Sequence, residues 1–218
     1  MIVLTGTDPL KSTLTVAVTK AAKKINPTAD GRTSIGTVIG TGLKKLTAKA
    51  SDLIGLGINV GTDYLGSVSV MSIRNGADIV AGGTNLQKTS IAVGPGKLAG
   101  DGTISTGSDI TLGSILASLQ ATSYDDVGVD STVNDITAPR IGTITIKANF
   151  GAEIDVSGAG VDHLKKKNSL GKLDVRGVID GSNMNVIGNI GTVSSYGFLN
   201  SRLFGGYAGN DIGTTPLG

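Results

Sequence analysis

Cysteine is absent from this chain of 218 residues, and His163 is its only histidine. The absence of cysteine excludes disulfide bonds, thiol chemistry and every zinc site built on thiolate ligands. With one histidine, an imidazole zinc site and a hydrolase triad of the usual kind are not expected either. Because stacking can replace cross-links as the source of stability, a chain without cysteine is compatible with a location outside the cell.

Aromatic residues are few: four Tyr, three Phe and no Trp. The core must therefore be mainly aliphatic, and few rings are available to stack on sugars or bases. No apolar run reaches 18 residues, so the sequence predicts no membrane span. The start, Met1 to Thr7, lacks the basic and apolar regions of a signal peptide, so we predict a strand there, in a piece of a longer protein.

The formal charge of +2 is unevenly distributed along the chain. Residues 1–50 hold eight Lys/Arg and two Asp, which gives +6, and residues 51–218 hold eleven bases and fifteen acids, which gives −4. The basic part has no interleaved aromatics and no recognition motif, so we expect a solvated surface and no nucleic-acid partner. Between Lys97 and Arg140 there is no basic residue, and this is the most acidic stretch.

A four-residue phrase, apolar-Gly-polar-aliphatic, recurs along the chain and opens a unit of about twenty residues. Its copies begin at Leu65, Ile141, Leu170 and Ile190. Leu112-Gly113-Ser114-Ile115 repeats the phrase, and Ile35-Gly36-Thr37-Val38 resembles a first copy. A period of this size predicts a solenoid, in which each unit buries its apolar face against its neighbours.

Residues after each phrase alternate between aliphatic and polar side chains, which is typical of a half-buried strand. Val68 and Val70 are predicted to point inward, and Ser67 and Ser69 outward. About ten residues into the unit, Asn75-Gly76, Asp180-Gly181 and Asn200-Ser201 predict a tight corner, because Asn, Asp and Gly tolerate positive φ. A second aliphatic cluster and closing glycines then complete the unit.

This pattern predicts an all-β protein, a parallel β-helix with about three short strands per coil. We place a strand-rich N-terminal cap at residues 1–34, the β-helix at 35–209 and a tail or linker at 210–218. Unequal spacing between copies predicts insertions near 84–138 and 161–169. Insertions of this kind project from one face of a solenoid, which is often the working face.

Three segments resemble β-helical parts of very large secreted bacterial surface proteins of the adhesin type. They are Leu4 to Pro9, Gly36 to Lys44 and Ile73 to Ile79. The resemblance implies export to the cell surface, many stacked modules and a role in adhesion or in the cell envelope. It implies no catalytic residue that can be assigned here.

Calcium is the metal that the acidic stretch favours, because Ca²⁺ takes six to eight oxygen ligands. Four carboxylates lie on one glycine-containing segment: Asp125, Asp126, Asp130 and Asp135. Their spacing matches neither an EF-hand loop nor the calcium-binding nonapeptide repeat of RTX proteins, so a solvated acidic loop is the alternative. No other cofactor is expected.

The sequence favours a non-catalytic structural or adhesive module of a secreted or cell-surface protein. Its expected partners are neighbouring repeat modules, another copy of the chain, or a surface polysaccharide. The alternative is a carbohydrate-active β-helix enzyme, a polysaccharide lyase or hydrolase, for which Lys147 and Arg176 are predicted to face outward. The pair Asp125 and Asp126 does not suit glycoside hydrolysis, because adjacent strand residues point to opposite faces.

Overall fold

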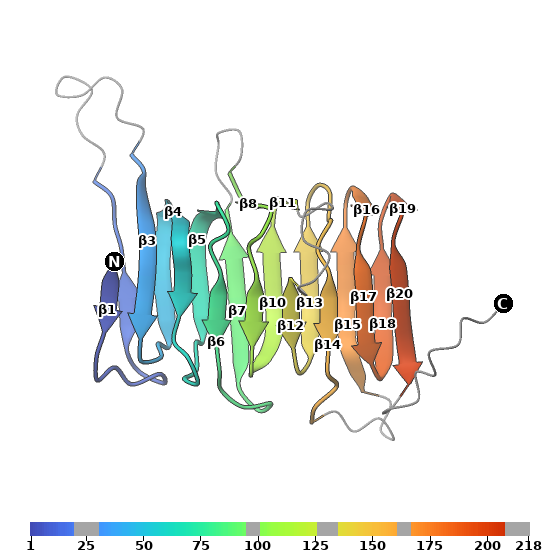
Figure 1. Cartoon of the computed structure of the whole chain (residues 1–218), viewed down its shortest axis with the longest axis horizontal. Coiled ribbons are helices and arrows are strands. Elements are labelled where there is room, and N and C mark those ends of the chain that lie inside the picture. Colours follow the sequence, from blue (N-terminus) through green and yellow to red (C-terminus); the bar gives the residue numbers. More distant parts are fainter. Residues whose placement is uncertain (20–30, 95–100, 126–134, 161–166, 208–218) are drawn as a thin grey trace.

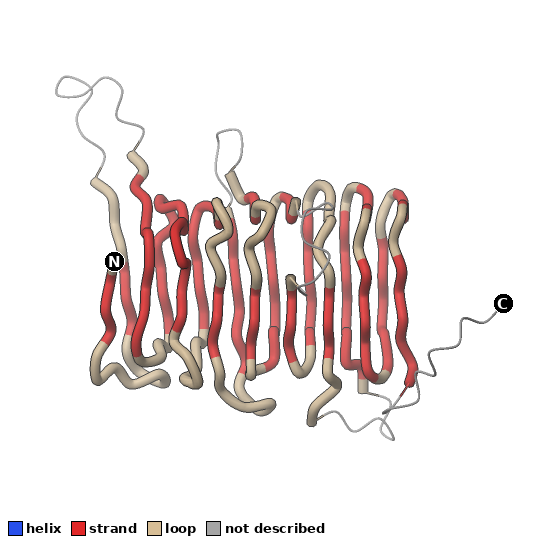
Figure 2. The backbone as a smooth tube through the Cα atoms, in the orientation of Figure 1, coloured by secondary structure: helices blue, strands red, loops and turns tan. Residues whose placement is uncertain are grey.

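The computed structural model describes residues 1–19, 31–94, 101–125, 135–160 and 167–207. Every regular element in these ranges is a β-strand, and the strand pairings are parallel. Figure 1 shows the strands stacked in chain order from the N-terminal to the C-terminal end, and Figure 2 shows the turns that join them. The prediction of an all-β, parallel, solenoid-like fold is therefore confirmed. The predicted tail, 210–218, lies outside the described residues.

The strands pair in three series, which we call the first, second and third ladders, in the order in which the chain passes through them from β5 to β6. The first ladder contains β2 (Thr13–Thr15), the start of β4 (Lys45–Asn59), β5 (Ser67–Ile73), β7 (Lys88–Val93), β10 (Ile115–Ala121), β13 (Ile141–Ile146), β15 (Asn168–Val175) and β18 (Asn189–Ser194). It contains the recurring phrase, since Ile141, Leu170 and Ile190 are register partners.

The second ladder is made of shorter pairings. It contains the start of β3 (Thr33–Gly40), the middle of β4, the end of β5, β8 (Thr103–Ile104), β11 (Ser123–Tyr124), β16 (Val178–Asp180) and β19 (Gly197–Leu199). Phe150 bridges Tyr124 on one side and Ile179 on the other, which makes this ladder continuous between β11 and β16.

The third ladder contains the second aliphatic cluster of each unit. It runs through β1 (Ile2–Leu4), the end of β3, the end of β4, β6 (Ile79–Ala81), β9 (Ile110–Leu112), β12 (Ile136–Ala138), β14 (Ile154–Val156), β17 (Asn183–Ile187) and β20 (Arg202–Tyr207). Strand β4 takes part in all three ladders.

The predicted cap and the first predicted insertion both contribute strands to these ladders. Strands β1 and β2 pair with β3 and β4. Strands β7 to β12 fall within or at the edge of 84–138. Of the second predicted insertion, 161–169, only Lys167 to Ser169 are described, and Asn168 and Ser169 already belong to β15.

One repeat of the phrase is not in register with the other copies. Leu112 lies in the third ladder, opposite Ala81, whereas the residue that pairs with Ile141 is Leu116. The structural equivalent of the phrase in this coil is therefore Leu116-Ala117-Ser118-Leu119, with alanine in the glycine position. Ile35 is also displaced, because it pairs with Leu53 in the second ladder. A four-residue match does not distinguish two corners of one coil that use similar residues.

Close stacking explains the glycine of the phrase. A Cβ built on Gly66, Gly142, Gly171 or Gly191 would lie 2.1–2.4 Å from a carbonyl oxygen of the preceding coil. None of the four has a positive φ, so the requirement is space and not backbone conformation. The glycine lets two backbones approach where the chain enters the first ladder.

The predicted corners are confirmed at the turns that leave the second ladder. Asn75 and Asn200 are the non-glycine residues with positive φ among those described, at 59° and 46°. Gly76 and Gly181 also have positive φ, at 68° and 70°. Asn and Gly adopt this conformation at low cost, which is why the corner signal was readable in the sequence.

A single aliphatic core runs through the stack. In the inner coils the inward residues are buried, including Val68, Val70, Ile144 and Leu173, as the alternation predicts. Tyr124 and Phe150 add an edge-to-face pair of rings with centroids 5.9 Å apart. The Tyr124 hydroxyl donates to the Ser108 carbonyl at 2.5 Å and to the Asp135 carbonyl at 3.2 Å, so this buried polar group is satisfied.

Candidate functional site

Two of the four predicted calcium ligands lie in the described part of the chain. Asp125 directly follows β11 and is exposed, and Asp135 directly precedes β12 and is 3% exposed. Asp126 and Asp130 lie outside the described residues.

Both described aspartates accept hydrogen bonds from the protein. Oδ2 of Asp125 accepts from the Ser123 hydroxyl at 2.9 Å. Oδ2 of Asp135 accepts from the backbone N–H of Glu153, in the next coil, at 2.5 Å. Asp135 therefore ties two coils together. No group of three or more His, Cys, Asp or Glu side chains suited to a metal ion is found within the described ranges, so calcium binding stays a prediction.

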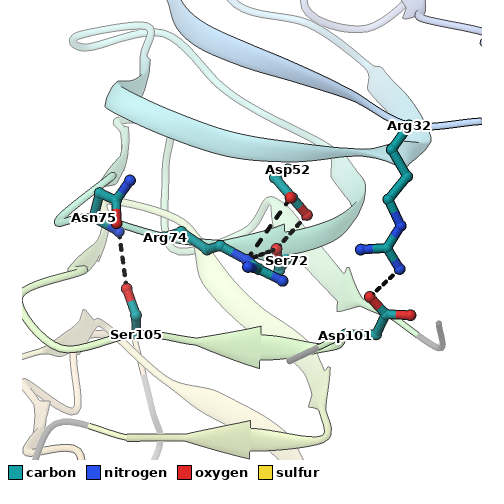
Figure 3. Close-up of polar contacts among 7 residues, drawn as sticks. All are labelled: Arg32, Asp52, Ser72, Arg74, Asn75, Asp101 and Ser105. Carbon is teal, nitrogen blue, oxygen red and sulfur yellow. Dashed lines mark hydrogen bonds and ion pairs between the residues drawn. The ribbon is translucent and has the colours of Figure 1, made fainter. Parts of the chain in front are cut away.

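A row of polar side chains follows the second ladder (Figure 3), and one of them, Ser72, is fully buried. Asp52 accepts a short hydrogen bond from the Ser72 hydroxyl, and Ser72 accepts from Nε of Arg74 at 2.7 Å. The Arg74 Nε lies 3.8 Å from Oδ2 of Asp52, which adds an ion pair between the two coils. One coil further on, the Ser105 hydroxyl accepts from the backbone N–H of Asn75 at 3.0 Å.

Arg32 and Asp101 form a second ion pair on the same side of the molecule (Figure 3). The Asp101 side chain is 2% exposed and the Arg32 side chain 17%. A carboxylate this deeply buried needs a cationic partner, because an unpaired buried charge is costly. The pair links the entrance to β3 with the segment before β8, 69 residues later.

These contacts hold neighbouring coils together, so the polar row has a structural role. Asp52 and Asp101 are each neutralised by an arginine, and the serine between Asp52 and Arg74 is shared by both. No motif in the sequence groups these residues. The available signal was that Asp52 and the Ser72/Arg74 pair are separated by about one coil, which register pairing brings side by side.

A different surface lies where the chain leaves the first ladder. Lys147 and Arg176 are exposed there, as predicted, on consecutive coils, and the backbone N–H of Arg176 donates to the Ile146 carbonyl at 2.9 Å. Two hollows follow this corner. One, of about 170 Å³, is lined by Gln120, Thr145 and Lys147 among others, and the other, of about 270 Å³, by Asp174, Arg176, Ser194 and Tyr196 among others.

Asp174 is held ionised in the second hollow. Its carboxylate accepts from the Lys172 ammonium at 3.0 Å and from the Ser194 hydroxyl at 3.1 Å. The hydrogen bond from Lys172, then that from Ser194, lower the pKa of Asp174, and the positive charges of Lys172 and Arg176 act in the same direction.

Comparison of the chain with protein families, with curated proteins and with solved structures finds no significant match. The resemblance to bacterial surface proteins therefore stays a prediction. In the part of the chain that the structure describes, no helix is long and apolar enough to cross a membrane.

Proposed function

We propose that this chain is a non-catalytic structural and adhesive module of a secreted or cell-surface bacterial protein. The observation that carries the proposal is the single aliphatic core, which runs from the N-terminal strands to β17, with Ile190 and Val193 of the last described coil packed against it. Such a stack is stiff along its axis because every coil is fixed to both neighbours by backbone hydrogen bonds and by packing. The stack would hold modules attached at its two ends a fixed distance apart, and it presents a long side surface.

Each coil has three short strands in this proposal, one from each ladder. The sequence Val68–Val70, Ile73 and Ile79–Ala81 provides one such coil, and Leu173–Val175, Ile179 and Met184–Val186 provide another. Chain order and register both support this arrangement. A coil of this size could not bury its own aliphatic residues, so it is stable only within the stack.

The partners proposed are neighbouring repeat modules or a second copy, which would stack on the ends. In the last described coil, Phe198 and Leu203 are 42% and 38% exposed, although their register partners Ile179 and Met184 are fully buried. An apolar surface of this kind at the edge of parallel strands favours contact with another layer.

Sedimentation velocity over a range of protein concentrations tests the stacking proposal. We expect reversible association that Leu203→Lys weakens, since a charge at this inward position opposes burial. Leu86→Lys is the matched control, because Leu86 is 85% exposed in the turn between β6 and β7. A chain that stays monomeric at high concentration, or equal association of both variants, would contradict stacking through this end.

The non-catalytic part of the proposal is tested by incubating the chain with acidic and neutral polysaccharides. We expect neither unsaturated products nor new reducing ends. The appearance of either would favour a polysaccharide lyase or a hydrolase instead.

A further inference from the structure

The corner at which the chain leaves the first ladder carries two parallel rows of polar side chains. Gln120, Thr145, Asp174 and Ser194 form one row, since each is the register partner of the next. These four residues point outward from consecutive coils, opposite the buried residues Leu119, Ile144 and Leu173 that alternate with them.

The second row lies next to the first, just past the strand ends. It contains Lys147, Arg176 and Tyr196, all of them exposed. Backbone hydrogen bonds place these residues on consecutive coils, from Arg176 N–H to the Ile146 carbonyl and from Tyr196 N–H to the Gly177 carbonyl, both at 2.9 Å. The two hollows described above lie along these rows, and we call the surface made by the two rows and the two hollows the corner groove.

Tyr196 is an aromatic residue that is 88% exposed. The chain has only seven aromatic residues, and the two at the centre of its core are fully buried. An aromatic ring kept in water at the edge of a hollow offers a flat apolar face beside polar groups. This combination suits a pyranose ring, which has an apolar C–H face and a polar rim.

The charges of the groove favour an anionic ligand. Lys172 neutralises Asp174 through their 3.0 Å contact, so Lys147 and Arg176 leave the groove net positive. A guanidinium binds a carboxylate through two parallel hydrogen bonds, and an ammonium adds a second point of attraction. The amide of Gln120 and the hydroxyls of Thr145 and Ser194 are suited to sugar hydroxyls.

We infer that the corner groove binds an acidic, uronate-containing polysaccharide that runs along the axis of the stack. Consecutive coils are about 4.8 Å apart, so four coils give a groove about 15 Å long, which suits a short stretch of a linear glycan. Tyr196 supports one sugar ring, Arg176 and Lys147 bind carboxylates, and the first row binds hydroxyls. The inference adds a ligand to the adhesive role proposed above, and rests on that role only for the extracellular setting.

Affinity electrophoresis and titration calorimetry with polygalacturonate oligomers test this inference on the intact chain. We expect binding that weakens as salt is added, because exposed charges are screened. Tyr196→Ala and Arg176→Gln should each lower the affinity at least about tenfold, which corresponds to about 1.4 kcal/mol. Tyr196→Phe should keep most of the affinity, since phenylalanine keeps the aromatic ring.

Lys88→Gln and Phe204→Ala are the matched controls. Lys88 is an exposed cation at the opposite end of the first-ladder strands, and Phe204 is an exposed ring of the last coil that belongs to the third ladder. Both should leave the affinity unchanged. Thermal melting of each variant checks that a loss of binding is not a loss of folding.

Three results would overturn the inference: no binding of the uronate oligomer at millimolar concentration, equal binding of neutral oligosaccharides, or binding that Tyr196→Ala and Arg176→Gln leave intact. Tighter binding of a single-stranded oligonucleotide, lost in the same variants, would replace the polysaccharide with a nucleic acid. Cleavage of the bound glycan would contradict the non-catalytic function while leaving the groove in place, so the two proposals fail separately.

Discussion

At the scale of single residues, the glycine of the recurring phrase shows how backbone packing dictates sequence. Gly171 lies where the Gly142 carbonyl oxygen of the preceding coil would be 2.4 Å from a Cβ. The atom in the way belongs to backbone, so it cannot rotate aside as a side chain would. The glycine of the phrase therefore marks a close contact between the backbones of two coils.

Gly171→Ala tests this explanation. We expect it to lower the free energy of unfolding by about 1–3 kcal/mol, because the two coils must separate to admit a methyl group. Gly36→Ala is the matched control, since a Cβ there meets nothing within 4 Å and its φ is not positive. Urea unfolding measures both variants, and an equal effect of the two substitutions would contradict the packing explanation.

Asp155 carries a pH dependence of opposite sign to that of a stabilising carboxylate. Burial raises the pKa of Asp155 above its ordinary value. A carboxyl with a higher pKa in the folded chain than in the unfolded chain costs stability when ionised, and the cost disappears below the unfolded pKa of about 3.9. Asp155→Asn should therefore stabilise the chain at pH 7 relative to the wild type.

The stabilisation by Asp155→Asn should shrink as the pH falls and vanish near pH 3, where the aspartate is protonated in both states. Thermal melting of both proteins at the two pH values measures this. A difference in melting temperature that is the same at both would show that ionisation of Asp155 is not its cause.

Residue-level prediction from the sequence succeeded where the conformation of the chain alone decides the residue type. Asn75 and Asn200 were readable as corners because few residues tolerate positive φ. Contacts between coils were not readable in this way. The ion pair of Arg32 with Asp101 joins residues 69 positions apart, and neither side chain carries a local signal for the other.

At the scale of elements, each inner strand is stabilised by a neighbouring strand on either side. The position of a strand in the stack therefore sets how much it contributes to the free energy of unfolding. Leu173 pairs with Ile144 on one side and Val193 on the other, and it is fully buried. Val193 occupies the same position in the last described coil and is only partly buried.

Leu173→Ala should lower the free energy of unfolding by about 2–5 kcal/mol, because a core Leu-to-Ala change removes apolar contacts and leaves a cavity. Val193→Ala should lower the free energy of unfolding clearly less than Ile144→Ala does in the core, since solvent already reaches Val193. Chemical unfolding of the variants gives the comparison. Equal costs at Leu173 and Val193 would show that the last coil is as well packed as the interior.

Calcium binding by the acidic segment is tested by thermal melting with and without millimolar calcium. A ligand that binds only the folded chain must raise the melting temperature. We expect an increase that is lost in Asp125→Asn, whose side chain is exposed, and that EDTA reverses. No change on adding calcium would rule the site out, and the acidic segment would then be a solvated loop.

The strands were largely predictable from alternation, because a half-buried parallel strand exposes every second side chain. Register was less predictable. The phrase at Leu112 matched the pattern but lies in the third ladder, because similar aliphatic residues open more than one corner of a coil. Only the pairing of Leu116 with Ile141 and with Thr89 identifies the true equivalent.

At the scale of the whole molecule, the repeat period led to the correct class of architecture, since no unit of about twenty residues can bury its own core. The corner groove was not predicted as a unit. Its rows come from residues that are 20 to 29 positions apart, such as Thr145, Asp174 and Ser194, and only register brings them into line. Lys147 and Arg176 were correctly placed outside, but nothing in the sequence joined them to Tyr196.

The rigid module requires one continuous stack from β1 to β20, and hydrogen–deuterium exchange of the intact chain measures whether the stack is continuous. We predict that ladder amides of the inner strands, including β7, β10, β13 and β15, exchange together and slowest, with faster exchange in β1 and β18 to β20 at the two ends. Rapid exchange throughout β7 to β12, or two blocks with separate protection, would contradict a continuous stack and the rigid module proposed from it.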